Sequence, residues 1–186
     1  MELKQAIWGR RSVRAYSGEA VDRATLDALI EAAIQAPNGM NRQPWAFGLI
    51  AEPAALAELD AQAKAHLLAQ ITDDSPIAHY RDTLSREDFH LFYGAPALIV
   101  IYTKPGGASA SVDVCLAAQN LMLTAYEQGL GTCWIGFAQP FLNAPQTRAA
   151  MGVPEGYEAV APIIVGRPAA DFPRPERQTP EIIYSR

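Results

Sequence analysis

The chain has 186 residues, of which 49% are hydrophobic and 19% charged, and its formal net charge is −5. This length and composition predict a single domain over residues 1–186 with a sizeable apolar core. The acidic balance and the lack of a broad basic stripe argue against a nucleic-acid partner. No apolar run reaches the roughly 20 residues that span a bilayer, so no membrane partner is expected.

The first half of the chain alternates helical patterns with one strand. Helices are predicted over 2–9, from the N-cap Asp22 to Pro37, and from Pro53 to about 70, with a strand over 45–51. Asp22 is a typical N-cap, and Val21 before it can pack on Leu26 inside the helix. Residues 71–93 are charged and then aromatic, and they predict a loop with one short helix.

The second half continues the alternation. We expect a strand over 97–102, a helix over 109–128, a strand over 131–136, a helix over 143–151 and a strand over 157–166. The run 97–102 is apolar throughout, which is typical of a strand covered on both faces. Pro162 predicts an edge or irregular position for the last strand. The fold class is therefore α+β, with a central mixed β-sheet flanked by helices.

The helix over 109–128 has one narrow polar stripe, formed by Asp113, Asn120, Thr124 and Glu127. The rest of its surface is apolar, so we expect this helix to be nearly enclosed, with the stripe facing solvent or polar neighbours.

Residues 167–186, the C-terminal arm, are too rich in proline for a helix. The stretch "EIIY" near its end is apolar enough to pair as a strand. An arm that leaves its own subunit and adds to the sheet of a partner accounts for both properties.

The two cysteines, Cys115 and Cys133, form no CxxC motif, and the three histidines have no metal-ligand spacing, so no metal site is predicted. The N-terminal "MELKQAIWGRR" lacks the apolar core of a signal peptide. We therefore expect a cytoplasmic protein with free thiols.

The stretch "IWGRRSVRAYSG" places Arg10, Arg11 and Arg14 within five residues of an acidic chain. Such a run can be a solvated face or can pair with nearby acids. Ser12 adds a hydroxyl among the guanidinium groups, an arrangement that suits a phosphate or a carboxylate. A small phosphorylated ligand is the sharper hypothesis.

The loop "PNGMNRQPW" carries three amide side chains, those of Asn38, Asn41 and Gln43, in six residues. Ordinary turn chemistry explains it in part, since Asn and Gly tolerate left-handed conformations. We expect Pro44 to hold Gln43 extended. The amides would then form a hydrogen-bonding edge suited to a heteroaromatic ring.

The glycines of "GLGTCWIG" do not form a dinucleotide-binding fingerprint. Trp134 stands where that fingerprint needs its third glycine, and the segment follows a helix rather than a strand. Gly136, at a strand end, lets a flat ligand approach the backbone.

Taken together, these motifs resemble one family, the nitroreductase-like FMN-dependent oxidoreductases. The similar stretches are "RRSVRAY", "APNGMNRQPWAF", "DVCLAAQNLMLTAYEQGLGTCWIG", "VPEGYEAVAPIIVGRP" and "RQTPEIIY", which occur in the family's order. The resemblance implies the nitroreductase-like fold and a homodimer with FMN at the subunit interface.

The resemblance also implies roles for single residues. Arg10 and Ser12 would hold the phosphate, with Arg11 near the phosphate or ribityl chain and Arg14 at the pyrimidine end of the ring. Arg177 would be a second phosphate ligand, with Arg167 a weaker candidate. The remaining implied contacts are Asn38, Gly39, Asn41 and Gln43 toward FMN bound mainly by the other subunit, and Trp134, Ile135 and Gly136 along the ring.

The implied activity is ping-pong hydride transfer through flavin N5, from NADH or NADPH to a small aromatic acceptor such as a nitro compound or a quinone. The flavin carries this chemistry, so no catalytic side chain is expected. Two alternatives stay open: another flavin reaction, such as flavin cleavage or reductive dehalogenation, and a flavin-binding module without turnover.

Overall fold

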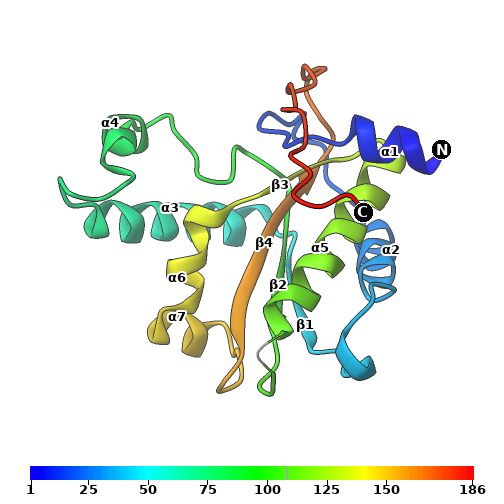
Figure 1. The fold of residues 1–186 in the computed structure, drawn as a ribbon. Helices are drawn as coiled ribbons and strands as arrows, with labels where there is room; N and C mark the ends of the chain where they lie inside the picture. The colour runs from blue at the N-terminus through cyan, green and yellow to red at the C-terminus, as the bar shows by residue number, and fades with distance from the viewer. Residues whose placement is uncertain (108) are drawn as a thin grey trace.

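Four strands form one antiparallel sheet in the order β1-β2-β4-β3 in the computed structural model, which describes residues 1–107 and 109–186 (Figure 1). They are β1 (Trp45–Ile50), β2 (Ala97–Thr103), β3 (Gly131–Trp134) and β4 (Glu158–Gly166). Every residue of β2 is buried, which confirms a strand covered on both faces. The α+β class is confirmed.

The expected mixed pairing is confined to one place. All pairs among the four named strands are antiparallel, and the parallel contact is the isolated bridge between Ser12 and Thr132. Pro162 also lies in the central strand β4 and not at an edge. The sheet accommodates it next to an irregularity, a register shift opposite Ile101 and Tyr102, and just beyond the β3 pairing, which ends at Ile163.

One face of the sheet is covered by α2 (Arg23–Ala33) and α5 (Ala110–Glu127), and α1 (Leu3–Gly9) packs on α5 (Figure 1). Asp22 caps α2 as predicted, because its carboxylate accepts the Thr25 N–H at 2.8 Å. Leu26 and Leu29 of α2 and Leu121 of α5 are fully buried against Ile99 and Ile163 of the sheet. No helix of the described residues is long and apolar enough to cross a membrane.

The opposite face is covered by α3 (Pro53–Gln70), α4 (Arg81–Ser85) and α6 (Gln139–Asn143), with α7 (Pro145–Ala150) following α6 (Figure 1). Short 3-10 turns η1 (Gly39–Asn41), η2 (Ala78–Tyr80) and η3 (Gly136–Ala138) lie in the connections. The single helix predicted over 143–151 is instead the end of α6 and all of α7. Pro145 forces Ala144 into an extended conformation, with φ −61° and ψ 135°, and so separates the two helices.

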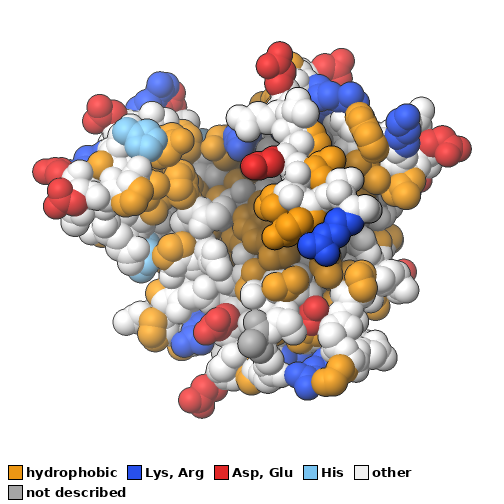
Figure 2. All heavy atoms as spheres, in the orientation of Figure 1, with side chains coloured by type: hydrophobic (Ala, Val, Ile, Leu, Met, Phe, Trp, Pro, Cys, Tyr) orange, Lys and Arg blue, Asp and Glu red, His pale blue; other side chains and the backbone are white. Residues whose placement is uncertain are grey.

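The exposed side of α5 differs from the prediction. Asp113 of the polar stripe is buried, the Asn120 amide donates to the Ala32 carbonyl at 3.3 Å, and Glu127 meets the N-terminal ammonium. The stripe therefore faces polar neighbours on its own chain. The exposed side is apolar, with Val112 at 58% and Leu116 at 41% exposure, and Figure 2 shows hydrophobic side chains gathered over this face.

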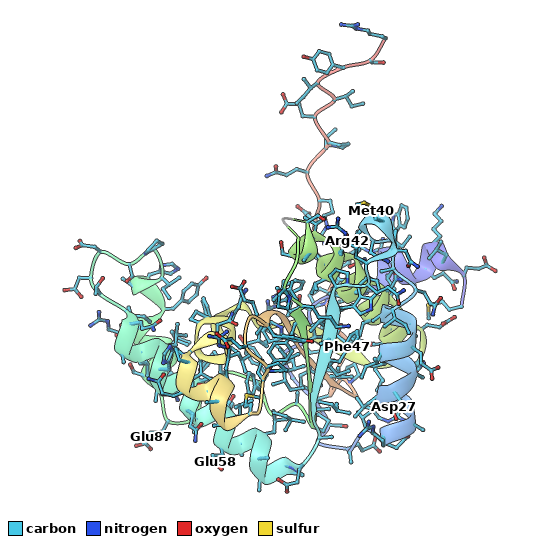
Figure 3. All side chains as sticks on the ribbon, turned by 90° about the horizontal axis from the view of Figure 1, so that it is seen from below. Asp27, Met40, Arg42, Phe47, Glu58 and Glu87 are labelled. Carbon is cyan, nitrogen blue, oxygen red and sulfur yellow. The ribbon has the colours of Figure 1, made fainter. Side chains whose placement is uncertain are left out.

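The C-terminal arm starts on the body of the molecule and then leaves it. Its first residues are held by the bridge between Tyr16 and Pro168 and by the Ala169 N–H, which donates to the Ala15 carbonyl. Its middle still lies against the segment 10–14, where Arg11 donates to the Phe172 carbonyl, and only the end of the chain stands away from the helix and sheet layers (Figure 3). Ile182, Ile183 and Tyr184 are 74–80% exposed.

Candidate functional site

The basic segment 10–14 lies along the outer edge of β3. The Val13 N–H donates to the Thr132 carbonyl at 2.9 Å, and Val13 itself is buried. A Cβ on Gly131 would lie 2.6 Å from the Val13 side chain, so this glycine allows the segment to approach the strand. Arg10, Arg11 and Arg14 are therefore fixed by strand-like pairing and not by a flexible loop.

A basic cavity of about 380 Å³ collects the predicted phosphate ligands. It is lined by Arg10, Arg11, Ser12, Arg14, Phe172, Pro173, Pro175 and Arg177. Residues from both ends of the chain thus meet, as the sequence motifs indicated. Among the described residues that line it there is no Asp or Glu.

The charge of the basic cavity is not balanced within the described part of the chain. No ion pair there involves Arg10, Arg14 or Arg177. Burial and the neighbouring Arg177 and Arg11 guanidinium groups lower the pKa of Arg10. A dianionic phosphate would remove this repulsion and accept several charge-assisted hydrogen bonds, so the donor set fits a phosphomonoester.

The five basic candidates do not have equal roles. Arg11 donates to the carbonyls of Gly9 and Phe172, so part of its hydrogen-bonding capacity holds the start of the arm. Arg167 lines neither the basic cavity nor its neighbour and pairs with Glu19 at 2.8 Å on the surface. Arg10, Arg14 and Arg177 are the best placed toward an anion.

A second cavity of about 210 Å³, which we call the aromatic cavity, adjoins the basic one, and Arg14 lines both. It is lined by Arg14, Leu91, Tyr93, Cys133, Trp134, Ile135, Gly136 and Phe137. The predicted Trp134, Ile135 and Gly136 supply its backbone wall where β3 ends. A Cβ on Gly136 would meet no described heavy atom within 4 Å, so this wall is open to a flat ligand.

The lining of the aromatic cavity consists mainly of apolar and aromatic side chains, with one guanidinium group and one thiol. Burial raises the pKa of the Cys133 thiol, which is therefore held neutral. Leu91, Tyr93 and Phe137 were not predicted to belong to the site. The sequence pattern over 71–93 left that segment as a loop, and no motif there pointed to a ligand.

The amide loop lies elsewhere in the same chain. The Gly39 N–H is 3.3 Å from both carboxylate oxygens of Asp113, near the start of α5, and Figure 3 shows Met40 and Arg42 on this loop. Gln43 is not extended as expected. It has φ +48°, and Asn41 has φ +53°, because the Asn38 side chain accepts the Gln43 N–H at 2.9 Å and closes a tight turn.

The two groups of predicted ligand contacts therefore sit at opposite ends of α5. The amide loop touches Asp113, whereas the segment leading to Arg10 packs through Gly9 on Tyr126. At a rise of 1.5 Å per residue these two positions of the helix are about 20 Å apart. One chain alone does not bring Asn38, Gly39, Asn41 and Gln43 to the basic cavity.

Comparison with known proteins agrees with these motifs. The family model described as "Nitroreductase family" matches residues 7–167. A protein of Archaeoglobus fulgidus, named provisionally as an NADH dehydrogenase/NAD(P)H nitroreductase, is 24% identical over 90% of this chain and 86% of its own length.

Two solved structures have the same fold over the whole chain. One is a nitroreductase with bound FMN from Bacteroides fragilis, at 28% identity, with 100% and 98% of the two chains covered and a TM-score of 0.83. The other is a nitroreductase with bound FMN from Desulfitobacterium hafniense, at 29% identity, full coverage of both chains and a TM-score of 0.84. This chain therefore belongs to the nitroreductase family.

Proposed function

We propose that this protein is an FMN-dependent NAD(P)H oxidoreductase that reduces small aromatic acceptors, nitro compounds or quinones. The observation that carries the proposal is a pair of cavities that share Arg14 as a lining residue. The basic cavity has arginines without carboxylate partners for a phosphate, and the aromatic cavity has an open backbone wall suited to a flat ring. The relatives with bound FMN support this choice of cofactor.

At the basic end, Arg10, Arg177 and the Ser12 hydroxyl would hold the phosphate. Their work is binding and orientation. Charge-assisted hydrogen bonds contribute roughly 1.5–3 kcal/mol each, so two or three of them account for tight retention of the cofactor. Arg11 would act one step away, by keeping the arm closed over the cavity through the Phe172 carbonyl.

At the aromatic end, Trp134, Ile135 and Gly136 would lie along the ring, and Arg14 would stabilise negative charge at its pyrimidine end. When bound, FMN would supply two-electron chemistry, accepting hydride from NADH or NADPH and then reducing the acceptor in ping-pong order. The protein would orient the nicotinamide and then the acceptor against the flavin ring, and would keep water from them. The name of the archaeal relative supports a nicotinamide donor.

We further propose that the working unit is a homodimer. The amide loop and the basic cavity are about 20 Å apart along α5, so a second copy is needed to bring both to one ligand. The exposed apolar side chains of α5, including Val112 and Leu116, offer a surface for that copy. Asn38, Gly39, Asn41 and Gln43 of one subunit would then approach the ring held by the other.

The C-terminal arm fits an exchange between subunits. The outer edge of β3 is already occupied by Ser12 and Val13, whereas β1 pairs only with β2 among the described residues. The Lys104 N–H donates to the Pro44 carbonyl, and hydrogen-bonded and non-bonded residue pairs alternate along an antiparallel ladder. The backbone N–H and C=O groups of Phe47 and Leu49 therefore point away from β2, toward the free edge of β1. We propose one domain over 1–186 whose arm, 167–186, adds to this edge in its partner.

The function is tested on the purified protein by its colour and by stopped-flow absorbance. We expect a yellow protein that releases FMN, identified by mass, on denaturation. NADH or NADPH should bleach the bound flavin, and a quinone or nitroarene should restore its absorbance. A protein that binds FMN but is bleached by neither nicotinamide would contradict the proposed activity and favour a flavin-binding module or another flavin reaction.

A further inference from the structure

Tyr93 occupies a backbone conformation that its side chain disfavours. The Ala95 N–H donates to the Phe92 carbonyl at 3.0 Å, and between them Tyr93 has φ +53° and Gly94 has φ +67°. Two consecutive positive φ angles define a type I′ turn, whose first central position is normally Asn, Asp or Gly. A bulky aromatic residue is an outlier there, and such strain gathers at functional sites.

The surrounding structure holds this turn in place. The buried carboxylate of Asp60 accepts the Phe92 N–H, and the Lys64 ammonium donates to the Phe89 carbonyl at 2.8 Å. Leu91 and Phe92 are 1% and 2% exposed and anchor the turn in the core. The Phe89 ring meets the Tyr93 ring edge-on, with centroids 5.8 Å apart. Held in this way, Tyr93 lines the aromatic cavity.

Arg14 and Tyr93 line the same cavity, and Arg14 also lines the basic one. The positive charge of Arg14 acts on the Tyr93 phenol. A guanidinium group only donates hydrogen bonds, so toward Arg14 the phenol oxygen can act only as an acceptor, and its O–H remains available to a ligand in the cavity. Burial raises the pKa of Tyr93, with Arg14 opposing, so the proton is present at neutral pH.

We propose that Tyr93 is a cofactor-binding residue that donates its O–H to a carbonyl-type oxygen at the end of a bound flat ring, next to Arg14. The inference rests on the proposed function, because the ring is that of FMN. The strained turn is retained for this contact and not for stability. Tyr93 and Arg14 would together form a paired donor set, in which the arginine polarises the phenol.

Two variants separate binding from folding. Tyr93→Phe removes only the hydroxyl, and Tyr93→Asn introduces a side chain suited to positive φ. Tyr157→Phe, at a tyrosine that lines neither of these two cavities, is the matched control. We would measure the thermal midpoint of protein stripped of FMN, the Kd for FMN and the midpoint potential of the bound flavin.

We expect Tyr93→Phe to weaken FMN binding by about three- to tenfold and to make the flavin potential more negative, since the electron-rich reduced ring loses a donor. Stripped Tyr93→Asn should unfold at or above the wild-type temperature and yet bind FMN still more weakly. Tyr157→Phe should change neither the Kd nor the potential.

Two results would overturn the inference while FMN still binds wild-type protein. One is Tyr93→Phe with unchanged Kd and potential. The other is a stripped Tyr93→Asn protein that unfolds at a clearly lower temperature, which would make the phenol a packing residue. Wild-type protein that fails to bind FMN at all would instead remove the proposed function itself, and with it this role of Tyr93.

Discussion

Arg10 is the residue on which phosphate binding depends most directly. It lines the basic cavity, donates to no carboxylate in the described part of the chain, and is repelled by Arg177 and Arg11. Such a group gains an interaction only when an anion is present. We expect Arg10→Ala to weaken FMN binding by roughly 1.5–3 kcal/mol, measured by titration of stripped protein. The stability of the stripped protein should hold or rise, because a source of repulsion is removed.

The control for this substitution is Arg23→Ala. The side chain of Arg23 is 75% exposed, and its ion-pair partner among the described residues is Asp27, one turn further along α2. Its removal should alter FMN affinity by less than about 0.5 kcal/mol. Equal losses in both variants would mean that net charge, and not the cavity, attracts the ligand.

Residue types were a better guide to the site than residue conformations. The motifs predicted that Arg10, Ser12, Arg14 and Arg177 belong to one site, and these four residues do line one cavity. The positive φ angles of Gln43 and Tyr93 could not be predicted, since they depend on side-chain contacts from Asn38 within the loop and from Asp60 of α3. The surface ion pair between Arg167 and Glu19 also could not be predicted, because these residues are far apart in the sequence.

At the scale of elements, local signals predicted most helices and strands to within a few residues. Asp22 and Pro53 set the starts of α2 and α3, and Gly129, with φ +74°, follows the end of α5. Sequence-based prediction failed where packing against other parts of the structure determines which face of an element is exposed. The helix over 109–128 was expected to be nearly enclosed, but Val112 and Leu116 of α5 are exposed in the single chain, a side that the proposed second copy would cover.

The Asp22 cap at the start of α2 predicts that the stability of the fold depends on pH. The backbone N–H and hydroxyl of Thr25 donate to the Asp22 carboxylate and lower its pKa. A depressed pKa in the folded state means that the stabilisation is present above the unfolded value, about 3.9, and is lost as the pH falls through the folded value.

Asp22→Asn keeps a capping side chain and removes the charge. We expect wild type to exceed this variant in free energy of unfolding at pH 7, with the gap closing as the pH falls below about 4. Denaturant titrations at several pH values measure it. Asp74→Asn, at an exposed loop position before η2, is the comparison. A gap that stays constant with pH would show that the carboxylate charge plays no part in the cap.

At the scale of the whole molecule, the exposed apolar surface is the main feature. Val112 and Leu116 on α5, Trp8 on α1 and the "EIIY" stretch of the arm are all exposed, and Figure 2 shows apolar side chains gathered on the α5 side. The free edge of β1 adds unpaired backbone groups among the described residues. Chains that leave so much uncovered tend to associate, and the proposed FMN site, whose two groups of residues lie at opposite ends of α5, would use the same second copy.

Removal of residues 179–186 tests the exchanged arm. Ile182, Ile183 and Tyr184 are 74–80% exposed in the single chain, so they contribute little to its own core. Burying each against a partner would contribute roughly 1.5–3 kcal/mol to association. We therefore expect the truncated protein to fold. The dissociation constant of its dimer should be at least about a hundredfold higher than that of the wild-type dimer, as those energies imply. Sedimentation velocity over a dilution series measures this shift.

Because FMN would lie between the copies, its affinity should fall with the dimer. A shorter truncation that removes only Ser185 and Arg186 keeps the apolar residues and should behave as wild type. An arm that can be deleted without any change in association would mean that α5 alone holds the copies together.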